Sequence, residues 1–349
     1  MHPLQQLIEG HKLTAEQWAS LLTAPAEVAA QLTEAARRLT ERVHGKRVTV
    51  RGLLEITNCC RNNCYYCGIR CGNNDVRRYA LSPEQIVQAA ADAYSAGFRT
   101  IVMQGGEWPA GDEMVERVVA AITSEMPDCA VTLSLGERPR EVYAAWRKSG
   151  AARYLLRHET ADTEHYSLLH PAEMSLAHRI DCLHSLRAEG YQVGAGMMVG
   201  TPGQGIAQLV ADLMFLQEFR PEMVGIGPFI PHPATPLAHN KAGNIDLTLR
   251  LISLVRLMLP AANIPSTTAL ATLAPDGRER GILAGANVVM PNATPAAFRA
   301  DYSLYERKAS SGAEAAEGLR LLADRMKAIK RTLDFSRGDF NPNFDINLT

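Results

Sequence analysis

From Val48 onward, the chain alternates short apolar runs rich in β-branched residues with amphipathic helical stretches. Eight such units in succession predict a parallel sheet, because a crossover between parallel strands runs through a helix. Eight units close naturally into a (β/α)8 barrel of the TIM type, and a doubly wound open sheet is the alternative. The expected strands are Val48–Thr57, Thr100–Met103, Ala130–Ser134, Tyr154–Leu156, Gln192–Val199, Met223–Gly227, Ile264–Thr267 and Asn287–Met290.

Helical segments flank this alternating region on both sides. Before it, the sequence from Thr14 to Gln17 has the pattern of a capping box, and a second helix is expected from about Pro25 to Val43. After it, a helix is expected near 313–331, followed by a polar tail. We therefore predict three parts: a helical cap packed under the main fold (1–45), the barrel (46–305), and a C-terminal helix with a tail (306–349).

The composition argues against several classes of protein. The net charge over 349 residues is −1 and there is no block of Lys or Arg, which argues against binding to nucleic acids or membrane surfaces. No apolar run approaches the ~18 residues of a membrane span, and Met1 to Gln6 have no basic or apolar signal region. Seven cysteines, four of them between Cys59 and Cys67, do not form a disulfide framework. We expect a reducing compartment, the cytoplasm.

The strongest motif is a C-x3-C-x2-C loop formed by Cys60, Cys64 and Cys67 directly after the first expected strand. Thiolates are the ligands that iron–sulfur clusters take, and three of them hold three irons of a 4Fe–4S cube. The fourth iron then keeps an open position, as a catalytic metal centre requires, whereas an electron-transfer cluster normally has four cysteines. In a barrel, a loop after a strand lies on the catalytic face.

Two alternatives compete with this interpretation of the cysteine loop. One is a structural zinc site, and the other is a four-cysteine cluster completed by Cys71. Zinc sites usually combine two C-x2-C pairs, or one pair with histidines, and the chain has only one such pair. We therefore favour the open cluster, and we expect Cys59 and Cys71 not to be ligands. Cys129 and Cys182 are expected to be buried thiols.

Polar residues follow the second and fourth expected strands. Gly105 and Gly106 allow a ligand to approach the backbone, and the carboxylate of Glu107 suits an ammonium group, although a Gly-Gly pair alone is more often a turn. Arg157 has the chemistry to clamp a carboxylate, and Glu159 to accept hydrogen bonds from ribose hydroxyls. Arg179, in the next helix, is a further candidate for a carboxylate. The alternative is a solvated ion pair at the strand end.

The later strands add candidates for the other half of the barrel mouth. Met198, in a glycine-rich strand, suits an adenine or a sulfonium, although a role in the strand core competes. Thr267 and Thr268 follow the seventh strand, and Arg299 and Tyr302 follow the eighth. If a cofactor occupies the first half of the barrel, a substrate must lie among these last strand ends.

The cysteine spacing, the strand before it and the aromatic residue beside Cys67 resemble the cluster loop of radical S-adenosylmethionine (SAM) enzymes. In that superfamily, the open iron binds the amino and carboxylate groups of SAM, and one electron then releases a 5′-deoxyadenosyl radical. A more specific resemblance is to the HydE-type maturases of FeFe-hydrogenase. It spans roughly Val48 to Tyr305 and rests on 55–70, 153–161, 223–237 and 264–269.

This resemblance implies a (β/α)8 barrel with one 4Fe–4S cluster and SAM as cofactors. It implies that Cys60, Cys64 and Cys67 bind the cluster. The residues around SAM would be Gly105, Gly106, Glu107, Arg157, Glu159, Arg179 and Met198. The residues of an inner anion or substrate pocket would be Arg153, Thr267, Thr268 and Tyr302. Some members hold a second cluster on C-terminal cysteines, but 301–349 contains no cysteine, so no second cluster is expected there.

The resemblance implies an enzyme that helps to assemble the diiron subcluster of the hydrogenase H-cluster. Its substrate would be a small organometallic or thiol-containing precursor, and its reductant a ferredoxin or flavodoxin. Other hydrogenase maturases would be further partners, and no nucleic acid or membrane is expected. The alternatives are a biotin-synthase-like or methylornithine-synthase-like enzyme acting on a small organic substrate, and a non-enzymatic iron–sulfur or zinc protein.

Overall fold

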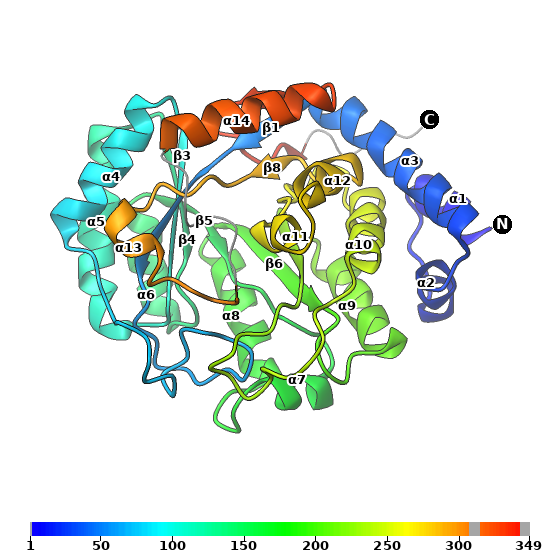
Figure 1. The fold of residues 1–349 in the computed structure, drawn as a ribbon, viewed down its shortest axis with the longest axis horizontal. Coiled ribbons are helices and arrows are strands. Elements are labelled where there is room, and N and C mark those ends of the chain that lie inside the picture. The colour runs from blue at the N-terminus through cyan, green and yellow to red at the C-terminus, as the bar shows by residue number, and fades with distance from the viewer. Residues whose placement is uncertain (1, 307–314, 343–349) are drawn as a thin grey trace.

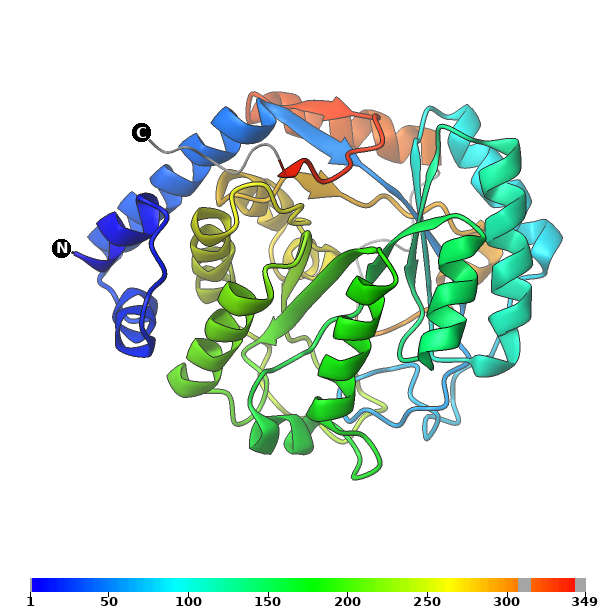
Figure 2. The ribbon, with the colours of Figure 1, turned by 180° about the vertical axis from the view of Figure 1, so that it is seen from behind.

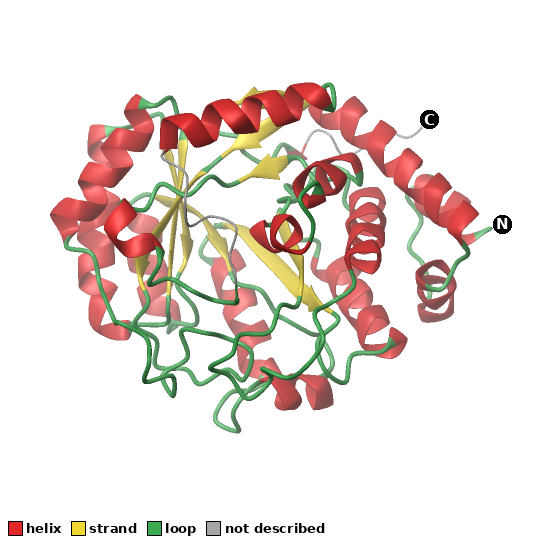
Figure 3. Ribbon diagram, in the orientation of Figure 1, coloured by secondary structure: helices red, strands yellow, loops and turns green. Residues whose placement is uncertain are grey.

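The computed structural model describes residues 2–306 and 315–342. Strands form the centre of the molecule and helices surround them (Figures 1 and 3). Six strands form one parallel sheet in which each strand pairs with the next in chain order. They are β2 (Gly52–Thr57), β3 (Thr100–Gly105), β4 (Ala130–Ser134), β5 (Ala151–Leu155), β6 (Gln192–Val199) and β7 (Met223–Pro228).

A second sheet, in the order β8-β1-β9, closes the ring. Strand β1 (Arg47–Val50) runs into β2 with only Arg51 between them, so that one expected strand becomes two. The N–H of Arg51 donates to the carbonyl of Val289 in β8 (Val288–Val289), at 3.0 Å. The N–H of Leu53 donates to the carbonyl of Pro291, just after β8, at 2.9 Å. Isolated bridges at 263 and 265 connect β7 to β8. The prediction of a (β/α)8 barrel is confirmed.

The prediction of a strand at Ile264–Thr267 is wrong. The structure has isolated bridges at Asn263, just before this range, and at Pro265 within it. Pro265 has no N–H to donate to a ladder. The N–H of Ile264 donates instead to the side-chain oxygen of Asn287, at 2.8 Å. The seventh position of the barrel is therefore held partly by side chains.

The helices are amphipathic, and their starts follow local capping chemistry. In α2, Thr14 Oγ1 accepts from the N–H of Gln17, whose side chain accepts from the N–H of Thr14, so the predicted capping box is present. The helices are α1 (Pro3–Ile8), α2 (Ala15–Leu22), α3 (Ala26–His44), α4 (Pro83–Ser95), α5 (Asp112–Glu125), α6 (Arg140–Lys148), α7 (Thr163–Leu169), α8 (Leu176–Ala188), α9 (Ile206–Phe219), α10 (Ile245–Met258), α11 (Thr268–Leu273), α12 (Gly277–Leu283), α13 (Ala296–Arg299) and α14 (Ala315–Ala328), with a 3-10 turn at Pro109–Gly111.

The N-terminal helices lie on the flank of the barrel, which corrects the expectation that they pack beneath it. Helix α3 packs along α10, and α2 packs against α9, so they add a layer outside the ring (Figures 1 and 2). Their apolar faces are buried there, with Leu32 and Leu39 of α3 among the core residues. No described helix is long and apolar enough to cross a membrane.

The C-terminal segment closes the end of the barrel opposite the cysteine loop. Helix α14 crosses this end (Figure 1). It is followed by β9 (Thr332–Asp334), an unexpected strand that pairs in parallel with β1. Residues 335–340, here called the C-terminal plug, then cross the barrel floor. The carbonyl of Gly338 accepts hydrogen bonds from Arg51 and Asn263, both at 3.2 Å. Residues 313, 314 and 343–349, part of the expected helix and tail, lie outside the described chain.

Candidate active site

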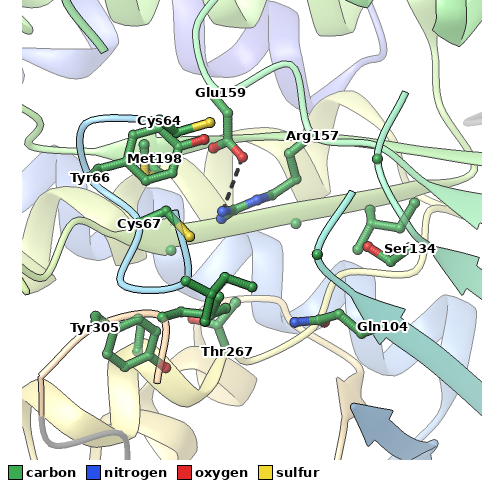
Figure 4. A pocket seen from close by; sticks show the side chains of 18 of the residues that line it. Cys64, Tyr66, Cys67, Gln104, Ser134, Arg157, Glu159, Met198, Thr267 and Tyr305 are labelled. Atoms are coloured by element: carbon green, nitrogen blue, oxygen red, sulfur yellow. Dashed lines mark ion pairs between the residues drawn. The ribbon is translucent and has the colours of Figure 1, made fainter. Parts of the chain in front are cut away.

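A cavity of about 310 Å³ lies at the carboxyl ends of the strands. This is the end of a (β/α)8 barrel where catalytic groups are found. Figure 4 shows Cys64, Cys67, Tyr66 and Met198 on one side and Gln104, Thr267 and Tyr305 on another. The expected site residues that line the cavity are Cys60, Cys64, Cys67, Gly105, Gly106, Glu107, Arg157, Glu159, Arg179, Met198, Thr267, Thr268 and Tyr302.

The cysteine loop brings Cys60, Cys64 and Cys67 to one wall of this cavity. Burial raises the pKa of all three thiols, that of Cys67 to about 12. These thiols are therefore protonated in the metal-free fold, and bound metal must displace their protons. Cys59 and Cys71 do not line the cavity: the thiol of Cys59 lies 3.5 Å from the carbonyl of Tyr79, and Cys71 is exposed.

The Gly-Gly-Glu turn after β3 packs directly on the cysteine loop. The N–H of Glu107 donates to Cys60 Sγ at 3.3 Å. One carboxylate oxygen of Glu107 accepts from Arg61 Nε and the other from the N–H of Glu137, each at 2.7 Å. Arg61 also donates its own N–H to the carbonyl of Glu107, at 2.8 Å. The Glu107 side chain thus holds the cysteine loop against the turn and leaves backbone groups of the turn facing the cavity.

Gly106 sits where no side chain fits. A Cβ atom at this position would lie 2.2 Å from the carbonyl oxygen of Cys59 and 2.8 Å from Cβ of Cys60. We expect Gly106→Ala to displace the cysteine loop, at a cost of about 1–3 kcal/mol for overpacking. That cost weakens cluster binding roughly tenfold, which is measured as iron bound per protein after anaerobic reconstitution. Gly205→Ala, which meets only a flexible glutamine side chain, is the control. Equal iron content in the two variants would contradict this prediction.

Arg157 and Glu159 reach the cavity from the segment that follows β5. They form an ion pair of 3.1 Å, with the Arg157 side chain 32% exposed and that of Glu159 7% exposed (Figure 4). Arg179, on α8, donates to the carbonyl of Arg157 at 2.9 Å and also pairs with Glu137. Three charged side chains thus converge on one wall, and Arg157 is the cation of the three that keeps partial contact with solvent.

Two buried oxygens in the cavity wall lack partners. Within the described chain, neither Glu159 Oε2 nor Thr267 Oγ1 has a hydrogen-bond partner. A buried polar atom without a partner costs free energy, about 1–3 kcal/mol, and native proteins rarely leave one so. Both residues line the cavity. Their oxygens therefore indicate that the cavity takes a polar ligand with hydroxyl or amine donors.

The comparisons with known proteins agree with this geometry. A family model described as the radical SAM superfamily matches residues 54–216. The FeFe hydrogenase maturase subunit HydE of Thermotoga maritima is 48% identical over 279 residues, which cover 79% of each chain. The chain belongs to the HydE family of radical SAM enzymes. A 3-methylornithine synthase of Methanosarcina barkeri is 30% identical over 81% of each chain. The crystal structure of methylornithine synthase PylB has a TM-score of 0.80, at 26% identity, over 95% of this chain and 97% of that one.

Membership of the radical SAM superfamily implies a 4Fe–4S cluster and SAM, and the described residues fit both groups. Three thiols line one cavity, and two residues with unpartnered buried oxygens, Glu159 and Thr267, line it as well. In the described chain, no three His, Cys, Asp or Glu side chains meet closely enough to hold a single metal ion. A cubane cluster instead offers a separate iron to each thiolate, so that the sulfurs need not converge on one point.

Arg153 was expected to line the inner anion or substrate pocket, but it does not line the cavity. Its side chain is fully buried near the barrel floor, where it pairs with Asp339 of the C-terminal plug. It also donates to Thr100 Oγ1 at 3.0 Å and to the carbonyl of Arg337 at 2.8 Å. The sequence places Arg153 on an inward-facing strand position but does not show that the plug lies within its reach.

Other cavity residues of this HydE-family chain were not expected from the sequence. Gln104 donates to the hydroxyl of Tyr302 at 3.2 Å, and Tyr66 contacts His170 Nε2 at 3.2 Å. Glu55 had a usable signal, since alternation along β2 places it on the same side as Leu53, and both line the cavity. Tyr66 and Tyr305 stand in loops, where no periodicity predicts orientation. The unexpected polar or aromatic lining residues are Glu55, Asn62, Tyr66, Gln104, Ser134, Phe229 and Tyr305.

Proposed function

We propose that this chain acts in FeFe-hydrogenase maturation, on a small iron- and sulfur-bearing precursor of the diiron subcluster. The observation that carries the proposal is the continuous cavity. The cluster cysteines and the inner polar residues Thr267, Thr268 and Tyr302 line the same cavity. The 48% identity to a HydE maturase supports the choice of pathway. A small substrate in such a cavity lies close to SAM and is shielded from water.

Within this proposal, Cys60, Cys64 and Cys67 would hold the cluster, and SAM would bind beside it. When bound and reduced, the cluster and SAM supply a 5′-deoxyadenosyl radical. The protein orients the two partners and excludes water. Glu159 accepts hydrogen bonds from the ribose through the oxygen that has no partner in the fold. The other groups around SAM are Gly105, Gly106, Glu107, Arg157, Arg179 and Met198.

The substrate in this proposal occupies the half of the cavity away from the cysteines. Thr267 Oγ1 is buried there without a partner, and the neighbouring Thr268 adds a second hydroxyl. Gln104 and Tyr302 are joined by a hydrogen bond of 3.2 Å and offer further polar atoms. An anionic group of the substrate would meet the two threonine hydroxyls. Arg153 is not part of this proposed substrate site, because its guanidinium already binds Asp339 and the carbonyl of Arg337.

We further propose a single cluster, since 301–349 contains no cysteine for a second one. The reductant would be a ferredoxin or flavodoxin, and other hydrogenase maturases would supply the precursor and accept the product. All seven cysteines are unpaired, which suits a reducing compartment such as the cytoplasm. The second candidate function is methylornithine synthesis, which the similarity to methylornithine synthases favours in both sequence and fold.

Complementation tests the proposed function most directly. The wild-type gene, introduced into a host that lacks its own HydE, is expected to restore active FeFe-hydrogenase, and the Cys60→Ala variant is not. In parallel, reconstituted protein with SAM and a chemical reductant should release 5′-deoxyadenosine above the Cys60→Ala background. Restored hydrogenase supports the proposal. Release of 5′-deoxyadenosine without restored hydrogenase, together with formation of 3-methylornithine in cells, would establish the second candidate instead.

A further inference from the structure

A buried histidine–aspartate pair lies behind the segment that carries Arg157 and Glu159. His158 stands between these two cavity residues, so its side chain points to the opposite side, toward α9. There, His158 Nε2 lies 3.2 Å from Oδ1 of Asp212, and both side chains are completely buried. Phe215, also on α9, covers the imidazole with ring centroids 4.7 Å apart. Neither member of the pair lines the cavity.

The hydrogen bonds of this pair indicate which ring nitrogen of His158 carries the proton. The N–H of Gly196 in β6 donates to His158 Nδ1, at 3.3 Å. A neutral imidazole that accepts at Nδ1 carries its proton on Nε2, which donates to Asp212. The same carboxylate oxygen accepts from the N–H of Ala161, at 2.6 Å. The pair thus ties residues 158 and 161, which bracket Glu159, to α9 and β6.

Glu159 between these two anchors has an uncommon backbone conformation. Its φ of 66° lies in the left-handed region, which non-glycine residues seldom adopt. Its N–H donates to the carbonyl of Gly196 at 3.0 Å, and its carbonyl accepts from the N–H of Met198 at 3.2 Å. A strained residue keeps such a conformation only when its surroundings over-determine it. At this position, the strain directs the Glu159 side chain into the cavity.

We infer that His158 and Asp212 are positioning residues: they hold Glu159 in the left-handed conformation in which its carboxylate reaches the ribose hydroxyls of SAM. The inference rests on the proposed role of Glu159 as the ribose ligand. Asp212 acts from outside the barrel wall, through two hydrogen bonds and without contact to any ligand. Its removal should therefore reproduce the loss of the Glu159 carboxylate and add nothing to it.

The test measures how much the ribose hydroxyls contribute to binding. Cluster-loaded protein is titrated by calorimetry with 5′-deoxyadenosine and with 2′,3′,5′-trideoxyadenosine, which lacks both hydroxyls. We expect wild-type protein to prefer the first ligand about tenfold, as one charge-assisted hydrogen bond provides. Glu159→Ala and Asp212→Ala should each lose this preference, and the double variant should match Glu159→Ala alone. Asp212→Asn should keep most of it, because the amide oxygen accepts the same two hydrogen bonds.

The outcomes separate the inference from the function on which it rests. If Glu159→Ala keeps the preference, the ribose role of Glu159 is wrong, and the inference is wrong with it. If Glu159→Ala loses the preference but Asp212→Ala keeps it, only the positioning role is overturned. Should Asp212→Ala fail to fold, His158→Ala tests the same point through the bond to Gly196. Asp181→Ala, an exposed change on α8, is the control and should behave as wild type.

Discussion

Cys64→Ala is expected to reduce 5′-deoxyadenosine release to background, whereas Cys71→Ala is expected to leave it unchanged. Cys64 lines the cavity together with Cys60 and Cys67, and Cys71 is exposed outside it. Loss of one of three thiolates leaves two irons without protein ligands, and a cube held by two cysteines is not retained. Iron content, visible absorbance and 5′-deoxyadenosine are measured in the same anaerobic samples, with SAM and a chemical reductant added.

This pair of variants also separates the two types of cluster considered from the sequence. A four-cysteine electron-transfer cluster completed by Cys71 would lose iron in both variants. An open cluster loses iron only in Cys64→Ala. The backbone of Cys71 donates its N–H to the carbonyl of Asn62, at 2.9 Å, and alanine preserves this bond. A fall in activity in Cys71→Ala equal to that in Cys64→Ala would overturn the assignment of the ligands.

Arg153→Met is expected to lower stability without changing SAM binding, whereas Arg157→Met is expected to weaken SAM binding with little change in stability. Arg153 is fully buried on the barrel floor, and its replacement removes an ion pair and hydrogen bonds to Thr100 and Arg337. We expect the free energy of unfolding to fall by about 2–4 kcal/mol, toward the lower part of the range for a broken buried pair because Asp339 is 40% exposed. The KM for SAM should not change. Denaturant unfolding and steady-state kinetics measure the two quantities.

Arg157→Met should instead raise the KM for SAM at least tenfold and change stability by less than about 1 kcal/mol. Arg157 lies in the cavity wall, and its ion pair with Glu159 retains contact with solvent. A charge-assisted contact to a ligand carboxylate accounts for the expected loss of affinity. If Arg153→Met raised the KM while stability stayed constant, Arg153 would have the substrate role that the structure denies it.

The effect of Arg153→Met on stability should depend on pH. Burial is the largest single influence on the pKa of Asp339 and acts to raise it, but the charges and hydrogen bonds of Arg153 and Arg337 together outweigh burial and hold this pKa below its ordinary value. A carboxylate with a lowered pKa stabilises the fold above its unfolded pKa, about 3.9, and loses that contribution as pH falls through the folded value. The stability difference between wild type and Arg153→Met is therefore greatest near neutral pH and shrinks below about pH 4.

Local patterns in the sequence were sufficient for the barrel and for the cluster loop. Strands β4 and β6 have the predicted bounds, because apolar β-rich runs there end at turn residues. The capping box of α2 forms as its sequence indicates. The cysteine triad needs only its own spacing and the strand before it. Each of these features depends on residues that are close together in the chain.

The features that the sequence did not reveal depend on long-range contacts. Strand β9 has only three residues, and it is a strand because β1 offers an open edge to it. Arg153 lies among charged residues that suggest a site, but in the fold it is near the barrel floor, where it pairs with Asp339. Tyr305 enters the cavity from the segment that follows α13. No periodicity predicts such placements, because they depend on how separate segments meet.

The C-terminal plug also affects the order of events during synthesis. Strand β9 pairs with β1, and 335–340 contact the side chains of Arg51 and Asn263 on the barrel floor. A ribosome makes these residues after every other described element of the barrel, so the nascent chain has an open floor with uncovered arginines until then. Contacts between such distant parts of a chain form slowly. Closure of the floor is therefore among the last steps of folding, and a truncated nascent chain would expose its interior to water and chaperones.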